Sequence, residues 1–271
     1  KMSKSLGNVV SPEEVIRDYG VDILRLYMLA ANAPWDDLKF NWEGVKTVQR
    51  ALSILWNVYR FPLPYMILDR YAPAAGPAGW DPAPLRDRVL TLAAEDRWIL
   101  SRVTSLARDV DAAMAGCQLH RATRAVQEFV LQDLSRWYVQ LVRHRMWMEG
   151  EAQEKQDAYD TLFHVLRRLI QLLSPFTPHL AEYLYQNLKA AGDPVSVHML
   201  DWPTGDSVLL DPALESAMEV VRAFDDAVAN ARQAGKRKLR WPVAEVVVTT
   251  LSPKVVAAVG MLQAICRARA H

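Results

Sequence analysis

Two lysines at the start of the sequence lie three positions apart in a segment of small and polar residues. Lys1 and Lys4 belong to the string KMSKSLGN, which covers residues 1–8. Because lysine carries a compact charge on a flexible stem, two lysines can follow a polyphosphate whose charge moves during a reaction. The segment is therefore a candidate phosphate clamp. The same composition also suits a solvated surface loop, and the residue types alone leave both interpretations open.

Two further groups of cations lie beside aromatic residues. In the first group, Arg143, Arg145 and Trp147 place cations and an indole ring at the end of a predicted helix, where bases can stack and phosphates can bind. The second group consists of Lys236, Arg237, Lys238 and Arg240, directly before Trp241. Its charge density suits backbone phosphates, and a solvated linker is the alternative. We expect the nearby Trp137 to lie in the core.

The composition excludes several classes of protein. With 32 basic and 31 acidic residues, the chain must meet any nucleic acid through local patches instead of a global field. Its 2 cysteines lie far apart and have no zinc-site spacing, so we expect neither a disulfide framework nor a metal site. No apolar run approaches the ~20 residues that span a bilayer, and we expect no signal peptide. We expect a soluble, cytoplasmic protein with no membrane partner.

Helical patterns fill most of the sequence and would position these groups. Apolar residues at alternating spacings of three and four predict helices, and capping residues mark their ends. Ser11 and Asp211, each followed by proline, start helices, whereas Gly20 and Gly116 end them. The expected helices cover residues 12–19, 21–31, 42–60, about 99–115, 119–147, about 159–173, 178–188 and 212–234.

Two breaks interrupt the helical pattern. Residues 62–94 hold six of the 15 prolines, which predicts an irregular connector with one short helix near residues 66–70. This connector is the best candidate for a hinge or an insertion. The string SPFTP at residues 174–178 separates two helices, and we expect Thr177 to cap the second of them.

The pattern changes after residue 235. The β-branched run VAEVVVTT at residues 243–250 predicts a strand, and Ser252 with Pro253 starts a last helix. One strand and one helix cannot bury a core by themselves, so this part predicts the start of a small α/β domain that is truncated. The expected fold class is therefore mainly α, a helical bundle followed by that α/β segment.

The string KMSKS at residues 1–5 resembles letter for letter the signature of class I aminoacyl-tRNA synthetases. The segments LGNVV, SPEEVI, YGVD and LRLY that come after it are similar to the branched-chain subgroup of that family. The runs APWDDLKF at residues 33–40 and LWNVYRF at residues 55–61 resemble isoleucyl-tRNA synthetases of the archaeal type. The run LLSPFTPHLAE at residues 172–182 is similar to a break in the family's anticodon-binding bundle. The resemblance covers essentially the whole chain.

This resemblance assigns roles at the start of the chain. In the family the signature loop closes over ATP, with Mg²⁺ assistance, while the amino acid is activated. It implies that Lys4 first, and Lys1 second, steady the charge on the leaving pyrophosphate. Met2 and Ser3 would shape the loop or contact the nucleotide. The family's other ATP motif, His-Ile-Gly-His, occurs nowhere in the sequence. We therefore expect a C-terminal fragment that is inactive alone and reaches isoleucine only through a missing catalytic domain.

The resemblance also divides the chain and names a partner. It implies a signature loop with connecting helices at residues 1–40, a helical anticodon-binding domain of class Ia at 41–200, a connecting helix at 201–235 and the truncated α/β domain at 236–271. The partner would be tRNA(Ile), bound by a monomer. Arg143, Arg145 and Trp147 are the candidate contacts in the bundle. The candidates after the bundle are Lys236, Arg237, Lys238 and Arg240.

Several alternatives stay open on the sequence alone. The valine-, leucine- and methionine-specific members of the same family are close enzyme alternatives. A stand-alone helical RNA-binding module is another class of function, and a bundle that binds only protein is a third. The sequence upstream of Lys1 would discriminate among these classes, because a nucleotide-binding α/β domain there would identify a synthetase.

Overall fold

The computed structural model describes residues 10–148, 150, 152–238, 241, 245–247 and 249–270. It is mainly helical, as expected, and the described residues form a single two-stranded sheet. The helices are α1 (Pro12–Tyr19), α2 (Val21–Ala31), α3 (Trp42–Arg60), α4 (Leu63–Leu68), α5 (Ala83–Asp87), α6 (Ala94–Ala115), α7 (Leu119–Glu128), the π-helix η3 (Phe129–Tyr138), α8 (Val139–Met146), α9 (Gln153–Leu173), α10 (Pro178–Leu188), α11 (Pro212–Ala234), α12 (Pro253–Met261) and α13 (Gln263–Ala270). Short 3-10 turns are η2 (Val89–Thr91), η4 (Val197–Met199) and η5 (Ser207–Leu209), and the strands are β1 (Ala75–Gly76) and β2 (Gly79–Trp80).

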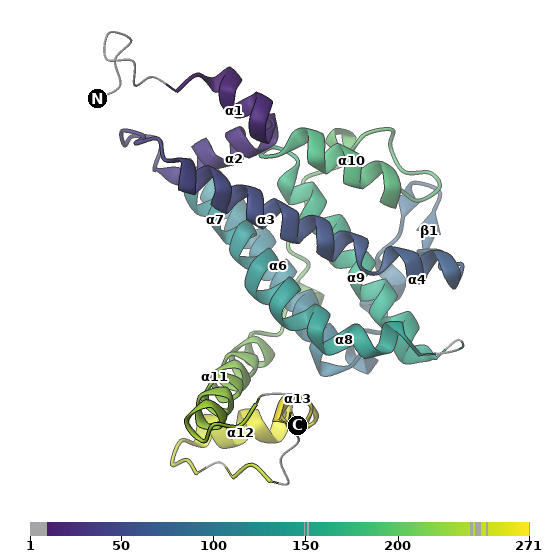
Figure 1. Ribbon diagram of the computed structural model, residues 1–271. Coiled ribbons are helices and arrows are strands. Elements are labelled where there is room, and N and C mark those ends of the chain that lie inside the picture. Colours follow the sequence, from purple (N-terminus) through teal and green to yellow (C-terminus); the bar gives the residue numbers. More distant parts are fainter. Residues whose placement is uncertain are drawn as a thin grey trace.

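The core lies among α3, α6, α9, α10 and the continuous helical run α7–η3–α8 (Figure 1). The apolar stripes predicted for α3, the α7–η3–α8 run and α9 are all buried, which confirms them. They are Val45, Val48, Leu52, Leu55 and Tyr59; Val126, Val130, Leu134, Trp137 and Leu141; and Tyr159, Leu162, Leu166, Leu169 and Leu173. Burying such stripes against one another is the main stabilising contribution to a helical bundle.

Helix α3 joins the two ends of the bundle. Its N-cap, Asn41, accepts a hydrogen bond from the backbone N–H of Glu43 at 2.9 Å, which fixes where the helix begins. The start of α3 packs against α2, and its end leads into α4 (Figure 1). Its 19 residues correspond to roughly 28 Å. The α1–α2 end of the bundle is therefore separated from the end formed by α4, α8 and the start of α9, which we call the α8 end.

A long-range cap connects α2 to α10. The carboxylate of Asp22 accepts a hydrogen bond from the backbone N–H of Leu180 at 2.7 Å, in the first turn of α10. The expected cap, Thr177, makes no such bond, because its hydroxyl donates back to the carbonyl of Leu173 instead. The helix begins where the sequence predicts, but a carboxylate from a distant helix satisfies its free N–H.

Helix α11 is attached to the bundle through charges and aromatic rings. The guanidinium of Arg222 lies 4.9 Å from the ring centre of Trp98 and 5.4 Å from that of Trp137. It also pairs with Asp133 of the π-helix at 2.7 Å. Arg269 of α13 stacks on Trp137 as well, at 4.9 Å. Trp137 is 5% exposed, which confirms its predicted place in the core. These contacts fix α11 and its neighbours below the bundle (Figure 1).

The expected strand at residues 243–250 is wrong for its described residues. Residues 245–247, 249 and 250 lie in no strand. A β-branched run needs a partner strand to form a ladder, and no described residue supplies one. The expected single last helix is divided at Leu262 into α12 and α13, and these pack on α11. Among the described residues of 236–271, the regular structure consists of α12 and α13, and the start of an α/β domain there stays a prediction.

The proline-rich connector has more structure than expected. Its short helix lies at Leu63–Leu68, slightly earlier than predicted, and the hairpin β1–β2 was not predicted. Gly79 has φ +103°, and a Cβ there would collide with Asp193. Asp193 accepts from the N–H of Trp80 at 3.0 Å and pairs with the buried Arg167 at 2.9 Å. The hairpin is thereby fixed to α9.

Candidate nucleic-acid interface

The candidate phosphate clamp lies outside the described residues. Lys1, Met2, Ser3 and Lys4 all fall in the segment 1–9, so their roles remain predictions. Directly after this segment, Ser11 accepts from the N–H of Glu13 and caps α1, as predicted. Gly20, with φ +96°, turns the chain from α1 into α2. These two helices link the candidate clamp to the bundle.

At the α8 end, four exposed or half-buried side chains from three segments form one cluster. Trp147 is 59% exposed, and its indole N–H donates to the hydroxyl of Tyr65 at 2.9 Å. Tyr65 lies edge-on to Phe61, with ring centres 6.0 Å apart. The guanidinium of Arg143 lies 5.8 Å from the Phe61 ring. We call these four residues the aromatic platform. It combines open rings with a cation, which suits unstacked bases.

Arg145 does not belong to this platform, which corrects its predicted contact with tRNA. Its side chain is 5% exposed and pairs with Asp96 at 2.6 Å and with Glu95. Tyr138 donates its hydroxyl to the same Asp96 at 2.6 Å. Burial raises the pKa of Asp96 to about 6, against the lowering effect of Arg145. Burial lowers the pKa of Arg145, but the two carboxylates outweigh it and raise that pKa. Arg145 therefore holds α8 to α6.

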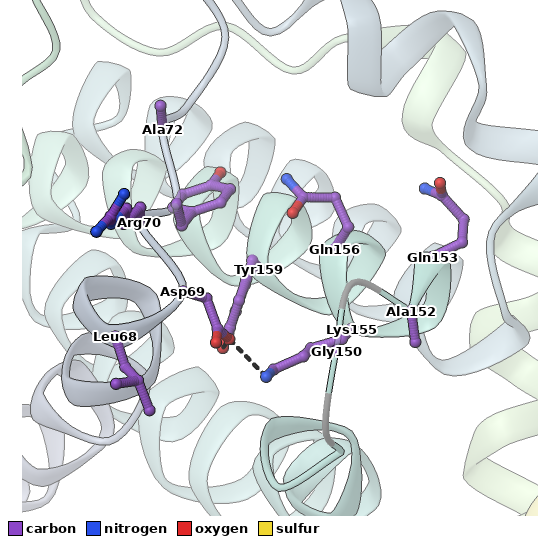
Figure 2. A pocket seen from close by; sticks show the side chains of 11 residues that line it. Leu68, Asp69, Arg70, Ala72, Gly150, Ala152, Gln153, Lys155, Gln156 and Tyr159 are labelled. Atoms are coloured by element: carbon purple, nitrogen blue, oxygen red, sulfur yellow. Dashed lines mark hydrogen bonds and ion pairs between the residues drawn. The ribbon is translucent and has the colours of Figure 1, made fainter.

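A hollow of about 610 Å³ opens beside the platform, between the end of α4 and the start of α9. Figure 2 shows Asp69, Lys155 and Tyr159 meeting at its centre. The ammonium of Lys155 lies 2.5 Å from Asp69 and donates to the carbonyl of Met148 at 2.9 Å. The hydroxyl of Tyr159 donates to Asp69 at 2.6 Å. Hydrogen bonds from Lys155 and Tyr159 lower the pKa of Asp69, so this carboxyl group stays ionised.

The residues of this hollow and half of the platform were not predicted from the sequence. Phe61 and Tyr65 come after α3 at the start of the connector, where the proline content directed attention to a hinge. An aromatic residue on each side of two prolines, close to a helix end, was the available signal. The sequence held no comparable signal for Lys155, since the importance of this residue depends on Asp69, which lies 86 positions earlier.

The second basic group lies after α11. Lys236, Arg237 and Lys238 are exposed, and none of them forms an ion pair within the described part of the chain. Lys238 lies 5.7 Å from the ring centre of Trp241. Arg240 lies outside the described residues. The structure does not bring this group into the aromatic platform, so the two groups are separate candidate surfaces.

Metal-binding and membrane-spanning features are both missing from the described part of the chain. It contains no group of three or more His, Cys, Asp or Glu side chains arranged to hold a metal ion. Cys117 is exposed and Cys266 is buried, and both are free thiols. Of the helices described, none has the length and apolar character needed to cross a bilayer.

Two relatives among those that match the whole chain illustrate the similarity. An isoleucine–tRNA ligase of Methanoregula boonei is 60% identical over 271 residues, which is 100% of this chain and 25% of that protein. An isoleucine–tRNA ligase of Methanoculleus marisnigri is 62% identical over 272 residues, covering 100% of this chain and 26% of that protein. The chain therefore spans about a quarter of the length of these relatives.

A solved structure and two family models agree with this match. The LeuRS in the ternary LeuRS-tRNA-LeuAMS complex of Agrobacterium radiobacter K84 has a TM-score of 0.55 and 22% identity, over 78% of this chain and 23% of that chain, which shows a likeness of fold. The model of class I tRNA synthetases (I, L, M and V) matches residues 1–41. The model of the anticodon-binding domain of tRNA ligase matches residues 96–248, more than half of the chain. The chain therefore belongs to the anticodon-binding domain family of tRNA ligases.

Proposed function

We propose that the chain is the signature-loop and anticodon-binding part of an isoleucine–tRNA ligase, which activates isoleucine with ATP and transfers it to tRNA(Ile). The observation that carries this proposal is the 60% and 62% identity, along the whole chain, to two proteins of that name. Identity at this level across the signature, the connecting helices and the bundle supports the isoleucine-specific member over the valine, leucine and methionine members. We also propose a cytoplasmic monomer.

The ATP side of this function rests on residues 1–40. Activation produces pyrophosphate as the leaving group, and two mobile ammonium groups suit the charge that builds on it. Lys4 is assigned the larger share and Lys1 the smaller, with Met2 and Ser3 contacting the nucleotide. ATP would bring Mg²⁺ as its counterion. The match of residues 1–41 to the class I synthetase model supports this assignment.

The tRNA side rests on the bundle within residues 41–200 and on the cations after it. The aromatic platform reads the anticodon, because single-stranded loops are recognised by stacking unstacked bases on aromatic rings and guanidinium planes. The exposure of Trp147 and the Arg143–Phe61 contact support this role. Lys236, Arg237 and Lys238 contact backbone phosphates, which position a nucleic acid without specifying its sequence.

The test uses the full-length ligase that contains this chain. Isoleucine should support exchange of pyrophosphate into ATP, and valine, leucine and methionine should do so much less. Trp147→Ala should weaken the binding of tRNA(Ile) by about 5- to 150-fold per stacked base. It should also reduce the difference in affinity between tRNA(Ile) and tRNAs that differ only in the anticodon. Trp35→Ala is the matched control, since Trp35 is equally open, at 65% exposure, but lies before α3. Equal activation of another amino acid would overturn the specificity. If Trp147→Ala lost affinity equally for all tRNAs, the platform would only position the tRNA.

A further inference from the structure

The hollow next to the aromatic platform has the size of a small-ligand site. Its volume of about 610 Å³ lies within the range of small-ligand sites. Lys155 donates to the carbonyl of Met148, the residue next to Trp147, so one side chain fixes both the wall of the hollow and the segment that carries the platform. A nucleotide stacked on Trp147 would therefore have a neighbouring nucleotide within reach of the hollow.

The charges at the centre of the hollow disfavour a phosphate there. The Asp69 carboxylate would face the phosphate oxygens, and the Lys155 ammonium is already paired with that carboxylate at 2.5 Å. Arg70 lies on the rim and carries an additional cation, which remains available for the phosphate of a bound nucleotide. The centre instead suits a neutral group that forms hydrogen bonds.

One oxygen of Asp69 is left open for such a group. Within the described part of the chain, both donors, the Tyr159 hydroxyl and the Lys155 ammonium, meet Oδ2, and Oδ1 receives no hydrogen bond. An ionised carboxylate only accepts hydrogen bonds, so Oδ1 selects a donor. The amide side chains of Gln153 and Gln156 line the same hollow from α9 and offer both donors and acceptors (Figure 2).

One wall also supplies flat apolar surface. The half-buried ring of Tyr71 lines the hollow and lies 5.4 Å from the buried ring of Tyr159, which holds it in place. Leu68, which is 78% exposed, lies at the edge of the hollow. A planar ring with a hydrogen-bonding edge fits a hollow with one aromatic wall and a carboxylate at its centre.

We propose, building on the function assigned above, that this hollow binds one unstacked base of the anticodon loop that carries an exocyclic amino group. The base is adenine, cytosine or guanine, and its amino group donates to Oδ1 of Asp69. The only donor on the edge of uracil, its ring N–H, lies between two carbonyl oxygens that the carboxylate would repel, so uracil is disfavoured. A neighbouring base then stacks on the aromatic platform, and the hollow adds a contact that distinguishes bases by their hydrogen-bonding groups.

The experiment first locates the base. Each nucleotide of the anticodon loop of tRNA(Ile) is made abasic in turn, and its affinity for the full-length protein is measured. We expect the abasic change at the bound position to weaken binding by about 5- to 150-fold. The Ala72→Trp substitution fills the hollow from its exposed rim. In this variant, the abasic substitution at the bound position should cause no further loss of affinity. If every abasic penalty is the same in Ala72→Trp as in the natural protein, the hollow holds no base.

A second variant tests the role of the carboxylate. Replacing the amino group of the located base by a carbonyl should weaken binding to the natural protein by about 10-fold or more, since a hydrogen bond to a charged group is removed. Asp69→Asn replaces the carboxylate, which only accepts, by an amide, which both accepts and donates, so that preference should shrink or disappear. Asp226→Asn, on the exposed face of α11, is the control and should leave it unchanged. An Asp69→Asn protein that keeps the original preference would overturn the assignment.

The outcomes separate this proposal from the assigned function. If binding to the natural protein does not depend on any anticodon base, the anticodon-reading function fails and the hollow proposal fails with it. If Trp147→Ala reduces discrimination but both hollow variants behave like the natural protein, only the hollow proposal fails. Urea unfolding of each variant confirms that it is folded before its affinity is compared.

Discussion

Replacing Arg145 by methionine should destabilise the fold instead of weakening tRNA binding directly. The change removes the partner of Asp96, whose side chain is 0% exposed, and the partner of Glu95, whose side chain is 15% exposed. Tyr138 alone would remain as a donor to Asp96. Breaking a buried ion pair from one side costs about 3–5 kcal/mol, because the other charge stays buried. We expect a loss of that size in the free energy of unfolding at pH 8.

The size of this loss should depend on pH. The folded-state pKa of Asp96, about 6, is raised above its unfolded value of about 3.9. Stability from the protonated form is therefore present at low pH and is lost as the pH rises through the folded-state pKa. Without Arg145, the effect of burial on Asp96 is offset less strongly, so the pKa of Asp96 rises further. The pH range over which stability is lost then extends to higher pH. The cost of Arg145→Met should be smaller at pH 5 than at pH 8.

Urea unfolding followed by circular dichroism measures both effects. Arg143→Met is the matched control, since Arg143 lies on the same helix but is exposed, and it should unfold like the natural protein. A double change of Arg145 and Asp96 to apolar residues should recover much of the loss, because the fully buried carboxylate of Asp96 is no longer left without its cation, and Glu95 keeps some contact with solvent. A stable Arg145→Met protein with weakened tRNA binding, or equal costs at both pH values, would refute the buried role of Arg145.

Four further changes have expected outcomes that can be measured. Lys4→Ala in the full-length ligase should lower the rate of isoleucine activation by roughly 10²–10³, measured by pyrophosphate exchange, and leave tRNA affinity unchanged. The 271-residue chain alone should show only background exchange, since it spans about a quarter of its relatives. Replacing Lys236, Arg237 and Lys238 by alanine should weaken cognate and non-cognate tRNAs alike; titrations at several salt concentrations should show a slope flatter by about 0.7–0.9 for each phosphate that is no longer neutralised. Arg222→Met should speed amide hydrogen exchange in α11 more than in α9, because the stack between Trp98 and Trp137 and the pair with Asp133 are removed.

The helices could be predicted because their signals are local. Helix α3 covers Trp42–Arg60 and α11 covers Pro212–Ala234, both as predicted, since each has an apolar period and a polar cap in its own sequence. Gly20 ends α1 for an equally local reason, its positive φ. The strand expected at residues 243–250 is absent at the residues of that run that the structure describes, because a strand depends on a partner elsewhere in the chain.

The role of Arg145 was open to prediction but was misjudged. The buried residues Trp137 and Leu141 are four positions apart, and Arg145 is the next position on that stripe. A cation in line with buried residues indicates a paired, buried charge, whereas Arg143 lies off the stripe and is exposed. The hollow at Asp69 and Lys155 had no comparable signal, because the two residues meet only after α4 and α9 are packed.

The length of α3 fixes the distance between the two ends of the bundle. A helix resists compression, so its 19 residues set a span of roughly 28 Å between the connecting helices and the aromatic platform. One added turn would move the platform by about 5.4 Å, which exceeds the reach of a hydrogen bond. A count of helical residues therefore sets the distance between the connecting helices and the aromatic platform, and a missing or added turn would displace the platform even if every one of its residues were kept.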